Sequence, residues 1–457
     1  MNALATDVVQ SAYRLALVGG GAIVHCVRMG VPLTAEDRAI LELEGPTVVG
    51  HTCKVVRLGP GAPTVADLRE AVERRLGDAP RLTWRLDGPS TDSEWCADTT
   101  FDIRAHICGS TATSELDGTA LGGEVARLFE QHLDRRRPLW RMDLVGPLVG
   151  GGTALVWRLH HALADGTTAM RLARAVLWDR LPDQPHAVRT FVPAHHAQSS
   201  DDARRRHHLA GFLEREFIPS LRRSPFDVPI GPDREIAFAM TSLPQLRTAA
   251  RSLAGATVND AVLAVMAGAL RAWMLHRHGP IHSVRVKVPV SLQNESEPTG
   301  NRDSYFCVSL PLDEPDPRAR LAAVRSETAL RKSCHDAQEM SELLDRLGRV
   351  SPRLRRWCSE LQGAPRAFAL NISNVPGPRL DVTVLGAPVE AIHSIAEVGE
   401  RHALRAAVVS VADRLCFGLC ADRGVIGDLD VLAGAIEHEA AAVIAAAGLA
   451  AASTRPP

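Results

Sequence analysis

Residues 158–167 read RLHHALADGT, in which two adjacent histidines, His160 and His161, are followed by Asp165 and Gly166. The preceding residues, GTALVWRLH, have the apolar content of a strand, whereas an aspartate before Gly-Thr is typical of a helix start. The histidines are therefore predicted to lie where a strand gives way to a helix, a position that presents side chains at a sheet end. Chance would produce HHxxxDG only roughly 0.003 times in a chain of this composition.

The two histidines are predicted to have different surroundings, because neighbouring residues of a strand point to opposite faces. That geometry argues against a metal bound by both, and we predict no metal site here. One imidazole is expected to pack and the other to face a cavity. A neutral imidazole with a pKa near 6.5 accepts a proton at physiological pH, as a general base must. A purely structural pair before a helix is the alternative.

Asp165 has two interpretations, and both make it structural. It caps the helix that starts at Gly166, or it binds a cation and holds the loop. The chain contains no GxSxG motif, so no serine nucleophile is predicted beside the histidines. This absence favours direct transfer to an activated acceptor over a covalent acyl-enzyme.

The composition excludes several classes of protein. The 457 residues favour two or three domains, and 52 basic against 53 acidic residues give a net charge of -1, so nucleic acid is not an expected partner. The nine cysteines have no framework spacing, which is typical of reduced thiols in a cytoplasmic protein. The chain has no Walker loop and no GxGxxG after a strand, so nucleoside triphosphates and dinucleotides are not supported.

Residues 1–31 form a hydrophobic N-terminal extension. Its apolar run, LALVGGGAIVHCV, is shorter than the ~20 residues that a membrane-spanning helix needs, and no convincing signal-peptide cleavage site follows it. Two interpretations remain: the extension folds onto the protein body, or it anchors the protein at a membrane surface.

The rest of the chain divides into two regions of mixed strand and helix signals, at residues 32–180 and 235–457. Residues 51–58, HTCKVVRL, predict a strand, and Thr257 with Asp260 predicts the cap of a long apolar helix. Between the regions, residues 181–234 are rich in Pro, His, Ser and charge and are interpreted as an interdomain connection. A short amphipathic helix is expected within this connection, at residues 209–224. The pattern predicts a two-domain α/β architecture.

Further motifs carry a family resemblance, in the order PLW (138–140), TVNDAVLAV (257–265), VPVSL (288–292), GNRDSYFCVSLPLDEPDP (300–317) and NISNVPGP (371–378). With HHxxxDG, they resemble the wax ester synthase/diacylglycerol acyltransferase family of the actinobacterial kind. That family shares HHxxxDG with chloramphenicol acetyltransferase and with condensation domains. The resemblance runs from about residue 32 to residue 449, and the DFGWG motif of other branches is missing.

The resemblance implies an α/β fold of two chloramphenicol-acetyltransferase-like domains with the active-site channel between them. It assigns His161 as the general base and His160 as its support, with Asp165 and Gly166 shaping the loop. Further supporting or substrate-binding residues are implied in PLW and in NISNVPGP: Pro138, Leu139, Trp140, Asn371, Ser373 and Asn374. Asn371, Ser373 and Asn374 are the candidate donors to the oxyanion.

The implied reaction needs no cofactor, since acyl-CoA is a co-substrate. The acceptor is diacylglycerol or a long-chain alcohol, so the product is triacylglycerol or a wax ester. The protein is expected in the cytoplasm, with peripheral contact to the inner face of the membrane or to lipid bodies as an added hypothesis. Two alternatives stay open: an acyltransferase for a polar or polyketide-like alcohol, and a non-catalytic paralogue that binds lipid.

Overall fold

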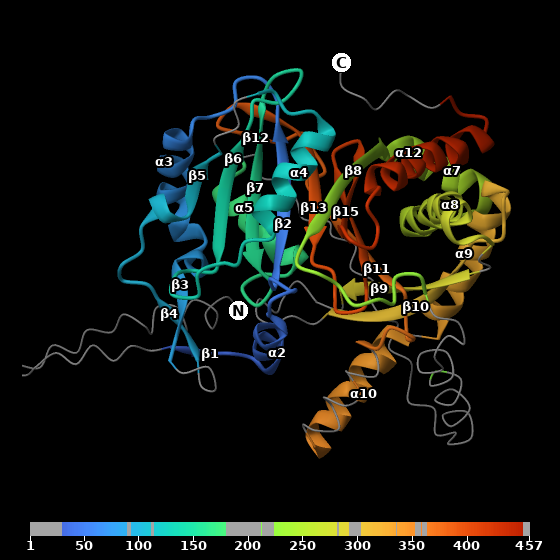
Figure 1. The fold of residues 1–457 in the computed structure, drawn as a ribbon, viewed down its shortest axis with the longest axis horizontal. Helices are drawn as coiled ribbons and strands as arrows, with labels where there is room; N and C mark the ends of the chain where they lie inside the picture. The colour runs from blue at the N-terminus through green and yellow to red at the C-terminus, as the bar shows by residue number, and fades with distance from the viewer. Residues whose placement is uncertain are drawn as a thin grey trace, which may run out of the picture.

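Two six-stranded mixed sheets form the framework of the protein (Figure 1). A computed structural model describes residues 30–88, 93–110, 114–179, 212, 224–280, 283–291, 303–334, 336–351, 358 and 363–450. The hydrophobic extension before residue 30 and nearly all of the amphipathic helix expected at 209–224 lie outside the described residues. A small third sheet has the strand order β1-β4-β3, from β1 (Val31–Pro32), β4 (Glu94–Ala97) and β3 (Trp84–Asp87).

The first large sheet carries the histidine pair. Its strands, in order, are β12 (Thr383–Val384), β13 (Ala387–Ala396), β2 (His51–Leu58), β7 (Thr153–His160), β6 (Trp140–Val145) and β5 (Ile107–Gly109). The helices of the same part of the chain are α2 (Ala35–Leu43), α3 (Val65–Arg75), α4 (Gly118–Phe129) and α5 (Gly166–Val176). Helix α4 packs against the second large sheet, where a Cβ atom added at Gly122 would lie 2.4 Å from the Ile236 carbonyl oxygen. Strands β2 and β7 are antiparallel, and their register places His51 opposite His160. The histidine pair therefore stands at the end of a central strand.

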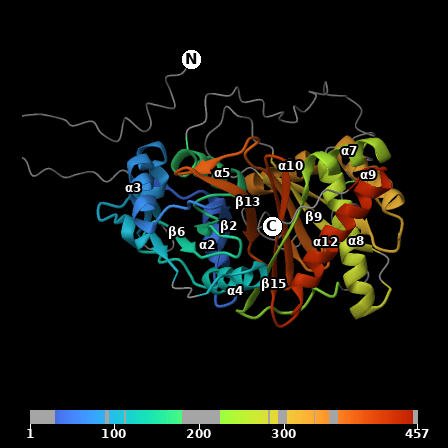
Figure 2. The same cartoon turned by 90° about the horizontal axis from the view of Figure 1, so that it is seen from above.

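The second large sheet comes from the later part of the chain. Its strands, in order, are β10 (Asp303–Pro311), β9 (Ser283–Ser291), β11 (Leu370–Pro376), β14 (Leu404–Val411), β15 (Arg414–Asp422) and β8 (Arg234–Ser242). Its helices are α7 (Leu243–Ala254), α8 (Val258–His278), α9 (Pro317–Ser333), α10 (Asp336–Val350) and α12 (Leu429–Ala446). Figure 2 shows α8 and α12 on the side of this sheet that faces away from α3.

Helix α8 is the core helix of the second half. Thr257 and Asp260 form the reciprocal capping box that the sequence predicts, and Gly279 follows the last turn with φ 73°. The helix is long and apolar enough to cross a membrane, but 72% of its apolar window is buried inside the protein. Its apolar surface is therefore used for packing against the other helices and the sheet.

A long strand from the later half of the chain crosses into the first sheet. Strand β13 belongs to the later half, yet it pairs antiparallel with β2 over Thr52 to Leu58 and so extends the first sheet. In Figure 1 the orange β13 lies beside the blue β2. The division of the sequence at residue 235 does not predict this crossover, because β13 reads locally like any other half-buried strand.

Strand β13 also packs closely on β15 of the second sheet. A Cβ atom added at Gly418 would lie 2.1 Å from the Ser394 carbonyl oxygen and 2.8 Å from Cδ1 of Ile395. The sheets therefore meet where one strand has no side chain, and a methyl group there would force them apart.

We expect Gly418→Ala to destabilise the protein by about 1–3 kcal/mol, because the added methyl overpacks the contact between β13 and β15. Urea unfolding measures this change. Gly434→Ala is the matched control, because Gly434 is an exposed residue of α12 with nothing within 4 Å of its added Cβ. That substitution should stabilise the helix by roughly 0.5–1 kcal/mol. Equal unfolding midpoints for Gly418→Ala and the wild type would contradict the close packing.

Candidate active site

The backbone of the histidine pair is held from both sides. The N–H of His160 donates to the Leu139 carbonyl at 2.9 Å, and the N–H of His161 donates to the Gly50 carbonyl at 2.9 Å. The His160 carbonyl in turn accepts from the N–H groups of Leu163 and Ala164. The strand end and the following turn are thus fixed by residues that precede β2 and β6.

Gly50 has no tolerable replacement at this position. Its φ is +71°, a left-handed conformation that favours glycine. An added Cβ atom would also lie 2.7 Å from Nε2 of His160. The residue therefore allows the loop before β2 to approach the imidazole and to bind the backbone of His161.

His160 is buried, with 1% of its surface exposed. Its Nδ1 accepts the N–H of Ala162 at 3.2 Å, so in the neutral ring the proton is on Nε2. Nε2 lies 3.4 Å from Oε2 of Glu44. The ring thereby connects the Glu44 carboxylate with the turn that follows His161.

The carboxylate of Glu44, at the end of α2, accepts hydrogen bonds from a small cluster of side chains. Its carboxylate accepts from Nδ1 of His132 at 2.8 Å and from Nε of Arg135 at 2.9 Å. Burial raises the pKa of this carboxyl, but the nearby imidazole of His160 and the hydrogen bonds from His132 and Arg135 outweigh burial and lower the pKa to about 2. The carboxylate is therefore ionised at neutral pH and can fix the tautomer of His160.

His161 is half-buried in different surroundings, because β7 ends at His160 and His161 is the first residue of the turn that follows. Burial and the nearby Arg405 guanidinium together lower the pKa of its imidazole to about 4, although Asp165 acts in the opposite direction. Nδ1 of His161 is buried and has no hydrogen-bond partner within the described part of the chain. The ring is thus neutral at physiological pH.

Asp165 caps α5, which is one of its two predicted roles. Its side chain accepts the N–H of Thr168 at 2.5 Å, and the residue is 2% exposed. Lys54 is a buried cation near this carboxylate: burial lowers the pKa of Lys54 to about 8, and Asp165 opposes that shift. Among the described residues no group of three His, Cys, Asp or Glu side chains could hold a metal.

The PLW residues contact the histidine pair through the Leu139 carbonyl. Leu139 and Trp140 are buried, and the indole N–H of Trp140 donates to the Leu82 carbonyl at 2.7 Å. The Trp140 ring stacks on His106 with 4.5 Å between centroids. The Pro138 carbonyl accepts the N–H of Trp140. These contacts position the Leu139 carbonyl that accepts from His160.

Strand β11 brings part of NISNVPGP to the candidate catalytic loop, residues 161–165. A Cβ atom added at Gly166 would lie 3.1 Å from Cγ2 of Val375, so this face of β11 meets the start of α5. Asn371 and Ser373 share that face with Val375, whereas Asn374 lies on the opposite face, because side chains alternate along a strand. Oδ1 of Asn371 is buried without a partner among the described residues.

Three site residues were not identified from the sequence: Glu44, Gly50 and Arg405. Arg405 lies beside Asn371 in the parallel register of β11 and β14, and burial lowers the pKa of its guanidinium. A lone arginine in the apolar run ALRAAVVSV is the one local signal that could have indicated it. Glu44 and Gly50 carry no such signal, because their roles depend on contacts distant in sequence.

Comparisons with known proteins agree with these features. The model of the wax ester synthase/diacylglycerol acyltransferase catalytic domain matches residues 33–215, and that of the WS/DGAT C-terminal domain matches residues 299–443. A Mycobacterium tuberculosis protein named as a diacylglycerol O-acyltransferase is 30% identical over 444 residues, covering 87% of this chain and 92% of its own. Another from that organism, named tgs2, is 30% identical over 376 residues, covering 75% and 82%.

The fold has solved counterparts. The wax ester synthase/diacylglycerol acyltransferase from Marinobacter aquaeolei VT8 superposes with a TM-score of 0.71 at 24% identity, covering 92% of this chain and 100% of its own. The starter condensation domain of rhizomide synthetase gives a TM-score of 0.56 at 15% identity, covering 90% and 94%. The predicted two-domain α/β fold of this superfamily is confirmed. The chain is an acyltransferase of the wax ester synthase/diacylglycerol acyltransferase family.

Proposed function

We propose that this protein transfers the acyl group of acyl-CoA to the hydroxyl of diacylglycerol or of a long-chain alcohol, with His161 as the general base. The observation that carries the proposal is the neutral, half-buried imidazole of His161, held by the Gly50 carbonyl beside the Asn371 face of β11. The names of the relatives support diacylglycerol as an acceptor. The rhizomide domain of the same fold was solved with C8-CoA, which supports a thioester donor.

The reaction proceeds by direct transfer. Since Nδ1 of His161 is buried, Nε2 takes the proton of the acceptor hydroxyl. The hydroxyl oxygen forms a bond to the thioester carbonyl carbon, and the carbonyl oxygen becomes an oxyanion. Collapse of this intermediate breaks the C–S bond, and the leaving thiolate of CoA takes the proton back from the His161 imidazolium.

The oxyanion needs a donor, and Asn371 and Ser373 are the two candidates on the side of the catalytic loop. The side-chain amide of Asn371 has N–H donors, and its oxygen has no partner within the described chain. Asn374, the third candidate, lies on the opposite face of β11 by strand alternation, so we assign it a structural role. Asp165 and Gly166 hold the loop, and Pro138, Leu139 and Trp140 support it.

Two other functions are alternatives to this proposal, and the first of them differs from it only in the acceptor alcohol. A family member that esterifies a polar or polyketide-like alcohol would use the same base, so only product analysis separates it from a neutral-lipid synthase. A non-catalytic lipid-binding paralogue has no need of the His160–Glu44 connection. The acyl-CoA donor places the reaction in the cytoplasm, and a lipid acceptor would bring the protein to the inner membrane face or to lipid bodies.

An assay of acyl transfer tests the proposal directly. Purified protein is incubated with palmitoyl-CoA and either diacylglycerol or hexadecanol, while free thiol and ester product are followed. We expect acceptor-dependent thiol release, which His161→Ala lowers at least 100-fold in kcat because the base is lost. His276→Ala, at an exposed position of α8, is the control and should retain activity. Full activity of His161→Ala would refute the assigned base. If none of the tested alcohols caused thiol release, the enzyme function would be refuted.

The pH dependence follows from the pKa of His161. The base works when the ring is neutral, so activity falls only as the pH drops through about 4. We expect kcat/KM to stay flat from neutral pH down to well below 6.5. An acid limb centred at 6.5 or higher would show that the ring is not held in the neutral state.

Glu44→Gln tests the positioning of His160. The amide cannot fix the His160 tautomer as the carboxylate does, so kcat should fall roughly tenfold, a loss of about 1.4 kcal/mol, with KM unchanged. Glu73→Gln, at an exposed position, is the control. A rise in KM with unchanged kcat would contradict a positioning role.

The stability of the Glu44→Gln variant has a defined pH dependence. The folded-state pKa of about 2 lies below the ordinary value of 4.5, so the carboxylate stabilises the fold above pH 4.5 and this stabilisation is lost as the pH falls toward 2. The variant should therefore unfold at a lower urea concentration than the wild type at pH 7, with a smaller difference at pH 4. A difference that grows in acid would contradict the depressed pKa.

A further inference from the structure

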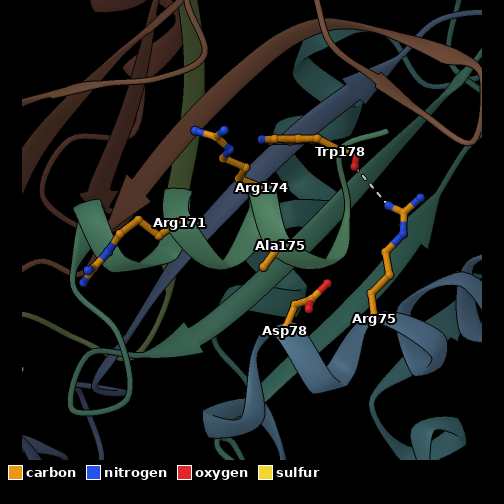
Figure 3. A pocket seen from close by; sticks show the side chains of 6 residues that line it. All are labelled: Arg75, Asp78, Arg171, Arg174, Ala175 and Trp178. Carbon is orange, nitrogen blue, oxygen red and sulfur yellow. Dashed lines mark hydrogen bonds between the residues drawn. The ribbon is translucent and has the colours of Figure 1, made fainter. Parts of the chain in front are cut away.

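A basic pocket lies beside α5, on the opposite end of that helix from the catalytic loop (Figure 3). Its volume is about 300 Å³, and its lining comes from α5 and the residues after it and from α3 and the 3-10 turn η2 (Leu76–Asp78). The lining residues, which we call the basic pocket, are Arg75, Asp78, Arg171, Arg174, Ala175 and Trp178.

The lining is positively charged, with three guanidinium groups against the single carboxylate of Asp78. Arg171 and Arg174 are exposed, and they leave α5 one turn apart. Arg171 donates to the hydroxyl of Thr168 at 2.9 Å, and no carboxylate within the described chain is ion-paired with it. Two adjacent exposed guanidinium groups are suited to an anion with several oxygens, above all phosphate.

Arg75 lines this pocket with a guanidinium that the protein already holds in place. Its NH1 donates to the carbonyls of Leu177 at 3.2 Å and Trp178 at 3.0 Å, and its NH2 lies 3.6 Å from Asp179. The Trp178 ring is 6% exposed and, with Ala175, supplies an apolar wall. The pocket thus combines a fixed cation, two exposed cations and an apolar wall.

The pocket is connected to the catalytic loop by α5 itself. The helix has 11 residues, so its length is about 16 Å at a rise of 1.5 Å per residue. A further arginine, Arg81, lies near the loop end, where its NH2 donates to the Ala162 carbonyl at 3.3 Å. Burial and the charge of Arg171 lower the pKa of the Arg81 guanidinium, and the carboxylates of Asp37 and Asp165 oppose that shift. Cationic side chains therefore follow the helix from the turn after His161 to the pocket.

We propose that the basic pocket binds the phosphate groups at the nucleotide end of acyl-CoA. This assignment rests on the proposed function. In acyl-CoA the thioester and the nucleotide phosphates are the two ends of an extended pantetheine arm, whose length is comparable to that of α5. With the thioester at His161, the phosphates reach Arg171, Arg174 and Arg75, and the adenosine lies against the apolar wall. Phosphate is also the chemistry of an anionic lipid headgroup, so the experiment separates the two sources.

The test compares a whole and a truncated donor. In the double variant Arg171→Gln/Arg174→Gln we expect KM for palmitoyl-CoA to rise about tenfold, with KM for palmitoyl-pantetheine, which lacks the nucleotide, unchanged. Binding of adenosine 3′,5′-bisphosphate, measured by calorimetry, should weaken by a similar factor. The double lysine variant should retain most of the binding. Arg74→Gln is the matched control, since Arg74 is exposed, pairs with Glu70 and does not line the pocket.

Each result decides the assignment. Equal KM changes for both donors, or unchanged binding of adenosine 3′,5′-bisphosphate in the double variant, would overturn it. Loss of binding to phosphatidylcholine vesicles containing phosphatidylglycerol, with nucleotide binding intact, would also overturn it and assign the pocket to lipid. The calorimetry needs no turnover, so nucleotide binding lost in the double variant supports the pocket even if the wild type transfers no acyl group.

Discussion

The buried carboxylate of Glu397 joins the two halves of the active site. Oε2 of Glu397 accepts the N–H of Val49 at 3.0 Å, and Oε1 accepts Nε of Arg234 at 3.0 Å. Its backbone carbonyl accepts NH1 of Arg405 at 2.9 Å. Glu397 directly follows β13, the strand that crosses from the later half of the chain into the first sheet. One residue therefore fixes both the loop that holds His161 and the arginine that stands beside it.

The buried carboxylate of Glu397 is paired with the guanidinium of Arg234. Burial raises the pKa of Glu397, while Arg234 and the Val49 N–H lower it. Removing either partner would leave a buried charge without compensation, which is far more costly than the pair itself. The same logic applies to Glu44, where three donors keep the carboxylate ionised. Both carboxylates thus determine where a histidine stands, and neither exchanges a proton in the proposed reaction.

Local features of the fold were predictable from the sequence, and long-range contacts were not. The strand at residues 51–58 and the capped helix after Thr257 were predicted because periodicity and capping are encoded within a few residues. The family was predicted because its motifs are specific, and the comparisons confirm it. The insertion of β13 and the contact of Glu44 with His160 could not be predicted, since each depends on tertiary pairing. The assigned roles of His161, Asn371 and Ser373 stay predictions.

The surroundings of His161 keep its imidazole neutral but also make it a weaker base. A ring that is buried near a guanidinium is a weaker base than a free imidazole, but it is almost entirely neutral at physiological pH. The imidazolium formed from such a ring is a correspondingly stronger acid, which favours return of the proton to the leaving thiolate.

The central claim is direct acyl transfer from the thioester to an alcohol activated by His161, and intact-protein mass spectrometry tests it most directly. Wild-type protein is mixed with palmitoyl-CoA without acceptor, and the reaction is stopped in acid before and after hexadecanol or diacylglycerol is added. We expect the protein mass to stay unchanged in every sample, with free CoA and ester appearing only after the alcohol. A protein carrying one palmitoyl group before the acceptor is added, and losing it afterwards, would contradict direct transfer.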